Sequence, residues 1–203
     1  MNLATFRKTI WILCALFGAL LAFLLAVGGP NGNGPSLPAA VETSPIGGAF
    51  SMTAHTGETV TEQTYAGKAW MIFMGFTNCP EICPTTLAEM SSWFADLGED
   101  GDDVRGFLVS VDPERDDLAT LRLYMSSFDK RIVALRPDTA ELERFAKAFK
   151  VYFKKVPLAD GDYTMDHTAG VLLFDRKGRF SGMIDMHESR DVVLRKIRRA
   201  TST

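Results

Sequence analysis

The sequence predicts an α/β domain with a mixed central sheet, preceded by one transmembrane helix and a tether. Short apolar runs alternate with amphipathic, helix-length segments over most of residues 46–203, the pattern of strands and helices packed in layers. An uncharged apolar block lies near the amino terminus at 10–27. The intervening stretch, dominated by Gly, Pro and small polar residues, cannot bury a core and is interpreted as a flexible tether.

The apolar block has nearly the length of a membrane span. Residues 10–27 are 18 residues without a charge or a proline, and a helix that rises roughly 1.5 Å per residue almost crosses a hydrocarbon core of roughly 30 Å. Arg7 and Lys8 precede it, and the next basic residue is Lys68. The positive-inside rule therefore leaves the amino terminus in the cytoplasm and sends the rest of the chain across the membrane.

A cleavable signal peptide is the alternative interpretation of this segment. The apolar block at 10–27 is longer than the core of a usual signal peptide, and the residues at its carboxyl end lack a clear Ala-x-Ala cleavage pattern. A retained single-pass anchor is therefore favoured. Cys14, inside the block, is interpreted as a small apolar residue. The predicted segments are a cytoplasmic amino terminus 1–8, an anchor 9–28, a tether 29–45 and a domain 46–203.

Composition narrows the function of the exported domain. Residues 46–203 contain 20 basic and 24 acidic residues, a net charge of −4 with neutral histidines. No basic face suggests nucleic acid as a partner. The domain has two cysteines in a single motif, which excludes a scaffold of several disulfides and requires a hydrophobic core.

The first half of the domain is predicted to contain a hairpin and two buried strands, each strand followed by a helix. Gly57 supplies the positive φ of the hairpin turn, and His55 is interpreted as a solvated turn residue. The strands are apolar on both faces, as expected at the centre of a sheet. Pro84 suits a first helical position, and apolar residues recur at helical spacing as far as Gly98. The predicted strands are 49–54, 58–61, 69–76 and 104–111, and the helices are 84–98 and 118–128.

The second half continues the alternation and ends with a hairpin and a helix. An Asp- and Gly-rich loop at 157–165 separates two extended segments, a turn at Asp175–Gly178 joins two strands, and the last helix is basic and amphipathic. The predicted strands are 132–135, 151–156, 170–174 and 179–184, and the helices are 141–149 and 189–200. This order predicts a thioredoxin-like fold with helices on both faces of the sheet.

Cys79 and Cys83 are the candidate chemical groups of the domain. They fall on the turn between the strand at 69–76 and the helix that follows, where open α/β sheets place their ligands. A helix amino terminus stabilises a thiolate, so a lowered thiol pKa is expected. The pair can form a disulfide or hold a soft metal ion, and three intervening residues leave more room for an ion than the usual two-residue redox motif.

His167 is the candidate third ligand. It lies just before an apolar strand, at the position where thioredoxin-like oxidoreductases normally carry a cis-proline, and no proline occurs after Pro157. Two thiolates and an imidazole suit Cu(I) and can also hold Cu(II), whereas structural zinc usually takes a fourth ligand. The alternative is a loop histidine with a purely structural partner. Asp166 is either an acceptor that orients the imidazole or a turn residue.

Three segments together resemble the Sco/SenC family of membrane-anchored copper proteins. They are Gly-Phe-Thr-Asn-Cys-Pro-Glu-Ile-Cys-Pro at 75–84, Ser-Val-Asp-Pro-Glu-Arg-Asp at 110–116 and Tyr-Thr-Met-Asp-His-Thr at 163–168. The resemblance implies that Cys79, Cys83 and His167 bind one copper per domain. It also implies delivery to the dinuclear copper site of cytochrome c oxidase subunit II, with another periplasmic copper chaperone or a thiol reductant as a further partner.

The resemblance leaves a second function open, and the sequence departs from the family at a few positions. The alternative is a thiol-disulfide oxidoreductase in which Cys79 and Cys83 reduce the subunit II cysteines. Asn78 and Glu81 replace residues more common in the family, as does Asp138. The stretch 112–116 is interpreted as a turn and helix cap rather than a catalytic acid. A second copper site at Met183, Asp185, Met186 and His187 is disfavoured, because methionines at alternating strand positions are usually packing residues.

Overall fold

A computed structural model of the protein describes residues 11, 15–23, 45–159 and 161–202. Residues 15–23 are helical, and within the described ranges no helix combines the length and apolarity needed to cross a membrane. The remainder of the predicted segments 1–8, 9–28 and 29–45, including Cys14, lies outside the described residues. The anchor and its orientation therefore stay predictions. Pro45–Thr203 forms one compact unit.

The compact unit is built on a mixed seven-stranded sheet of order β2-β1-β5-β4-β3-β8-β9. The three central strands β3, β4 and β5 run parallel, and the flanking strands run antiparallel to their neighbours. β1 and β2 form the predicted amino-terminal hairpin. The bounds are β1 Ser51–Ala54, β2 Thr59–Thr61, β3 Ala69–Gly75, β4 Val104–Ser110, β5 Ile132–Arg136, β8 Val171–Phe174 and β9 Phe180–Ile184.

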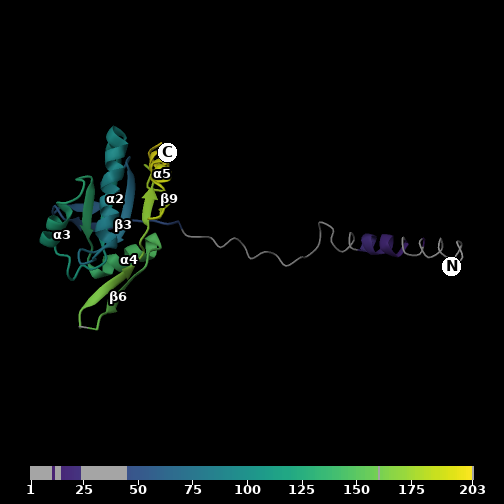
Figure 1. Cartoon of the computed structure of the whole chain (residues 1–203), viewed down its shortest axis with the longest axis horizontal. Helices are drawn as coiled ribbons and strands as arrows, with labels where there is room; N and C mark the ends of the chain where they lie inside the picture. Colours follow the sequence, from purple (N-terminus) through teal and green to yellow (C-terminus); the bar gives the residue numbers. More distant parts are fainter. Residues whose placement is uncertain (1–10, 12–14, 24–44, 160, 203) are drawn as a thin grey trace. The chain divides into compact units, whose positions relative to one another are not determined.

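Helices cover both faces of the sheet, as predicted. Gly106 of β4 lies against Met90 and Phe94 of α2, so α2 covers this face. α5 contacts α2 and the strands β3, β8 and β9. α4 lies on the opposite face, where Phe145 and Phe149 contact Phe50 (Figure 1). The helices are α2 Ile82–Leu97, α3 Leu118–Met125, α4 Thr139–Phe149 and α5 Arg190–Thr201, with a 3-10 helix, η1, at Gly98–Asp103.

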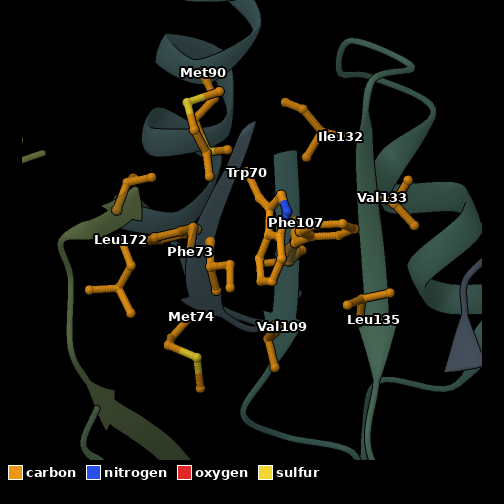
Figure 2. Close-up of a cluster of buried hydrophobic side chains, with 14 of the residues drawn as sticks. Trp70, Phe73, Met74, Met90, Phe107, Val109, Ile132, Val133, Leu135 and Leu172 are labelled. Atoms are coloured by element: carbon orange, nitrogen blue, oxygen red, sulfur yellow. The ribbon is translucent and has the colours of Figure 1, made fainter. Parts of the chain in front are cut away.

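Large apolar side chains fill the space between the layers. Figure 2 shows Trp70 and Phe73 of β3 together with Phe107 of β4 in this core. Trp70 stacks on Phe174 with ring centroids 5.2 Å apart. Each fully buried side chain of this size contributes roughly 1.5–3 kcal/mol. Packing in the core therefore holds the carboxyl ends of the parallel strands in fixed positions.

A second, two-stranded sheet extends from the main body. β6 (Phe153–Pro157) pairs antiparallel with β7 (Tyr163–His167), and Figure 1 shows this ribbon projecting away from the central sheet. The predicted loop at 157–165 is therefore too long at both ends, because β6 includes Pro157 and β7 begins at Tyr163. Its side chains are half-buried or exposed, so the strand lacks the apolar pattern by which strands are recognised in a sequence.

Gly75 ends β3 at a point where no side chain fits. A Cβ atom there would lie 2.9 Å from Leu108 Cδ1, 3.0 Å from Phe73 Cε1 and 3.2 Å from Cys83 Sγ. Glycine lets the backbone approach closely at such a position. The Cys83 sulfur therefore rests directly against the end of the strand.

The substitution Gly75→Ala is expected to lower the free energy of unfolding by about 1–3 kcal/mol, because overpacking forces neighbouring atoms to shift. It should also displace the Cys83 sulfur. Gly48→Ala is the matched control, since a Cβ at Gly48 would meet only Ala148 Cβ at an ordinary 3.5 Å. Chemical denaturation of both variants measures the effect, and equal stability of the two would contradict this account.

Candidate metal centre

The cysteine loop places both sulfurs at the amino terminus of α2. The Cys79 amide donates to the Phe76 carbonyl at 3.3 Å, and the Cys83 amide donates to Cys79 Sγ at 3.4 Å. Both cysteines are free thiols; Cys79 is half-buried, whereas Cys83 is buried. Cys83 lies within the first turn of α2 rather than on the preceding turn. The prediction that both residues precede the helix is therefore wrong for Cys83.

His167 meets Cys83 although 84 positions separate them in the chain. It is the last residue of β7, and its Nε2 lies 3.6 Å from Cys83 Sγ. Its Nδ1 lies 3.0 Å from the Thr168 carbonyl oxygen, which can only accept, so the neutral ring carries its proton on Nδ1. The lone pair of Nε2 is then free to face the sulfur.

Thr168, rather than Asp166, orients this imidazole. Asp166 is exposed and affects His167 only as a nearby negative charge. Neither interpretation left open by the sequence holds, because Asp166 makes no hydrogen bond to the imidazole among the described residues and lies in strand β7 rather than in a turn. A backbone carbonyl is an ordinary orienting partner for a ligand histidine, but no residue type in the sequence signals it.

Burial dominates the electrostatics of this pair. It lowers the pKa of His167, and the imidazole sits edge-on between Phe73 and Phe76, with ring centroids 6.0 and 5.9 Å away. Burial also raises the pKa of the Cys83 thiol well above its usual range, and the Phe76 backbone offsets this only in part. The expectation that the helix amino terminus lowers the thiol pKa is wrong for Cys83, because desolvation opposes the charged form more strongly.

Two buried carboxylates hold the cysteine loop and the β6–β7 ribbon in place. Asp116 is 0% exposed and accepts hydrogen bonds from the Thr77 amide at 3.2 Å, the Thr77 hydroxyl at 2.6 Å and the Ser110 hydroxyl at 2.6 Å. Asp112, 2% exposed, accepts from the Tyr163 hydroxyl at 2.9 Å and from Arg115. We call Thr77, Ser110, Asp112, Arg115, Asp116 and Tyr163 the carboxylate cluster.

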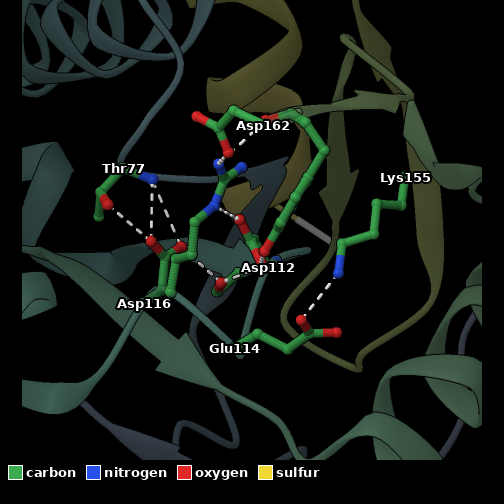
Figure 3. Close-up of polar contacts among 9 residues, drawn as sticks. Thr77, Asp112, Glu114, Asp116, Lys155 and Asp162 are labelled. Carbon is green, nitrogen blue, oxygen red and sulfur yellow. Dashed lines mark hydrogen bonds and ion pairs between the residues drawn. The ribbon is translucent and has the colours of Figure 1, made fainter. Parts of the chain in front are cut away.

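Figure 3 shows how this cluster converges from three parts of the chain. Arg115 donates to the Tyr163 carbonyl at 2.9 Å, and its guanidinium lies 3.7 Å from the centre of the Tyr163 ring. On the outer side, Lys155 of β6 pairs with Glu114 at 2.7 Å. The stretch 112–116 is thus structural, as predicted, but the residue that caps α3 is Asp117. The main role of the stretch 112–116 is to join the cysteine loop to the β6–β7 ribbon.

Tyr124 is a residue of the site that the sequence does not single out. Its hydroxyl is buried and has no hydrogen-bond partner among the described residues. Burial raises its pKa, and charges on Cys83, Cys79 and Asp116 raise it further. A buried hydroxyl without a partner is a donor whose capacity is unused.

The donor set fits a soft metal ion, although the three residues do not form a finished cage. Two atoms that share one ion at bond lengths of roughly 2.0–2.3 Å lie roughly 3.5–4 Å apart, and Cys83 Sγ and His167 Nε2 meet this spacing. In the part of the chain that the structure describes, no three His, Cys, Asp or Glu side chains are arranged to hold an ion. Cys79 Sγ instead accepts the Cys83 amide.

Other candidate positions stay outside this centre. Met186 Sδ accepts a hydrogen bond from the Thr86 hydroxyl at 3.3 Å, and His187 is exposed, which leaves the disfavoured second copper site without support. Asn78 and Glu81 are exposed. Asp138 caps α4 by accepting from the Glu141 amide at 2.7 Å. His55 is not a plain solvated residue, because its Nδ1 accepts from the Ala134 amide at 3.1 Å.

Comparison with known proteins identifies the family to which the chain is similar. The sequence profile of the SCO1/SenC family matches residues 38–202. The human protein SCO1 homolog, mitochondrial, is 35% identical over 138 residues, which are 66% of this chain and 46% of that protein. The chain spans about half the length of the curated relatives it matches.

Two solved structures extend the comparison. The copper-bound ScoI of Bradyrhizobium japonicum is 43% identical, with a TM-score of 0.71 over 76% of this chain and 99% of that one. BsSco, described as a member of the Sco family of cytochrome c oxidase assembly proteins with a disulfide switch, is 25% identical, with a TM-score of 0.62 over 79% of this chain and 95% of that one. The thioredoxin-like fold is confirmed.

Replacing the buried carboxylate of the cluster tests its role. Asp116→Ala is expected to lower the free energy of unfolding by about 2–3 kcal/mol, because the Thr77 amide and the Ser110 hydroxyl lose their acceptor. The loosened cysteine loop should also react faster with a thiol reagent. Asp117→Ala, which removes the α3 cap next to it, is expected to cost about 1 kcal/mol and leave thiol reactivity unchanged. Equal thiol reactivity in the two variants would contradict the proposed role of Asp116 in holding the cysteine loop.

Proposed function

Because the chain belongs to the SCO1/SenC family, we propose that it is a copper metallochaperone that delivers copper to the dinuclear site of cytochrome c oxidase subunit II. The observation that carries this proposal is the 3.6 Å approach of His167 Nε2 to Cys83 Sγ across 84 residues. A copper-bound relative of 43% identity supports the choice of metal. The proposed ligands are Cys79, Cys83 and His167, with one copper per domain as Cu(I), Cu(II) or both.

The chemistry of the donors suits copper as a cargo. Thiolates favour soft ions, and neutral imidazole is a good copper ligand. His167 is kept neutral by burial, with Nε2 free because Nδ1 faces the Thr168 carbonyl. Copper binding displaces the proton of the Cys83 thiol, so affinity is expected to weaken as the pH falls.

Cys79 is the proposed ligand on the side of the centre where a partner's ligand can approach the ion. Its sulfur turns from the Cys83 amide toward the imidazole to complete the set, and it is half-buried where Cys83 is buried. A three-coordinate ion leaves an open position at which a partner's thiolate or imidazole attacks before the donor ligands release. Transfer then proceeds by ligand exchange, with no free ion.

The proposed setting follows from the same family. BsSco is described as belonging to a family of cytochrome c oxidase assembly proteins, and the human relative is mitochondrial. We place this chain in the inner membrane through residues 9–28, with the domain in the periplasm and subunit II as the receiving partner. A second copper chaperone or a thiol reductant supplies the metal or keeps Cys79 and Cys83 reduced.

Loss of the imidazole tests copper binding directly. The full-length reduced protein in detergent is expected to bind about one Cu(I) per chain in competition with a chromogenic chelator. His167→Ala should weaken this binding by more than the roughly 10–100-fold typical of losing an outer-shell partner. His187→Ala, which removes an exposed histidine outside the centre, is the control. Equal affinity of the His167→Ala and unsubstituted proteins would refute the ligand assignment.

A thiol-disulfide oxidoreductase is the second candidate function. Cys79 and Cys83 are free thiols at a helix amino terminus, and one of them is accessible to a partner. Attack by Cys79 on a substrate disulfide would form a mixed disulfide, which Cys83 would resolve after losing its proton. The Cys79–Cys83 disulfide would form as the two substrate cysteines are reduced. This chemistry needs no imidazole.

Complementation of a strain that lacks the gene separates the two functions. Under copper transfer, His167→Ala is expected to abolish oxidase activity, and Cys79→Ser should do the same. Under thiol reduction, His167→Ala should retain most activity, whereas Cys79→Ser loses it. Oxidase activity of membranes, with the amount of each variant matched by immunoblot, provides the measurement.

A further inference from the structure

A cleft of about 920 Å³ opens far from the thiols, between α3 and the β1–β2 turn. Its lining includes Arg105 at the start of β4 and Ile132 at the start of β5. Both strands run parallel to β3, whose carboxyl end carries the cysteine loop, so the cleft lies at the opposite edge of the sheet from the thiols. The cleft is therefore separate from the proposed copper centre.

Three cations in this cleft form no direct ion pair with any residue that the structure describes. Arg105, Arg122 and Lys130 line it, and none of them forms an ion pair within the described ranges. By contrast, the neighbouring Arg131 is neutralised by Asp129 at 2.7 Å and by Asp102 at 3.8 Å. An excess of unpaired positive charge in one concave site stands out in a chain whose net charge is −3.

Two acids also line the cleft, against four cations, so its lining keeps a net charge of +2. Asp102 reaches Arg131, and Glu58 accepts a hydrogen bond from the Thr56 hydroxyl. His55 adds a neutral donor, because the Ala134 amide donates to Nδ1 and the ring proton then resides on Nε2. Burial lowers the pKa of His55 and keeps the ring neutral.

Aromatic side chains complete the lining. Tyr65 and Phe128 border the cleft, and the Arg105 guanidinium lies 5.6 Å from the centre of the Tyr65 ring. Such stacking holds a guanidinium in one orientation and leaves its other N–H groups available. Two arginines and a lysine around a concave surface match the charge and the several acceptor oxygens of a phosphate group.

We propose that this cleft binds a phosphate group, with Arg105, Arg122 and Lys130 as its charged ligands. The phosphate belongs either to a free phosphate compound or to the headgroup of an anionic phospholipid. Both sources present the same oxyanion to the same three cations, and the site is independent of the copper centre.

Calorimetric titration of the full-length protein in nonionic detergent tests the site. One arm uses inorganic pyrophosphate. The other uses dihexanoyl phosphatidylglycerol, with dihexanoyl phosphatidylcholine as its zwitterionic comparison. The double variant Arg105→Ser/Arg122→Ser is expected to weaken binding at least tenfold. The control Lys147→Ser/Arg195→Ser removes the same charge from exposed positions of α4 and α5 outside the cleft.

The arms give distinct outcomes. Pyrophosphate binding that the cleft variant loses and the control keeps supports a site for a free phosphate compound. Binding of the phosphatidylglycerol alone, lost in the same variant, supports a headgroup site. Failure of both probes to bind the unsubstituted protein overturns the proposal. An equal loss in both double variants also overturns it, because net charge rather than the cleft would then explain the binding.

Discussion

The carboxylate cluster is the constraint on which the rest of the site depends. Asp116 holds the cysteine loop through Thr77, and Asp112 holds the histidine ribbon through Tyr163 and Arg115. Because both carboxylates lie in one short loop after β4, two segments far apart in the chain are fixed to the same support. Buried carboxylates are costly unless their oxygens find donors, and the donors to Asp112 and Asp116 come from the segments that these carboxylates hold.

The surroundings of Cys83 and His167 explain why the pair persists without charge. Both side chains lose hydration at the edge of the aromatic core, and burial disfavours thiolate and imidazolium alike. A neutral thiol facing an unprotonated nitrogen is a compatible resting state. A cation that binds there displaces the proton of the thiol and stabilises the thiolate.

Sequence patterns predict the main sheet well because its strands are buried. β3 and β8 are continuous apolar runs bounded by turn residues, and Gly98 ends α2 with a positive φ. β7 is missed because a two-stranded ribbon outside the sheet buries little apolar surface. Cys79, Cys83 and His167 are found by residue type, and the structure brings Cys83 and His167 together. The Thr168 carbonyl, the unpaired Tyr124 hydroxyl and the raised pKa of Cys83 depend on three-dimensional burial, which no local pattern encodes.

The β6–β7 ribbon gives the two sides of the centre unequal mechanical freedom. The Cys83 sulfur packs against Gly75 at the end of β3, where the surrounding side chains leave no room for an added Cβ atom. His167 instead terminates a ribbon that forms a separate two-stranded sheet and is held to the domain body by side-chain bonds to Asp112 and Arg115. A force applied by a partner at the tip of the ribbon is therefore transmitted to the His167 imidazole and not to the Cys83 sulfur. Docking at a distance from the metal would then loosen one ligand first and give release a preferred direction.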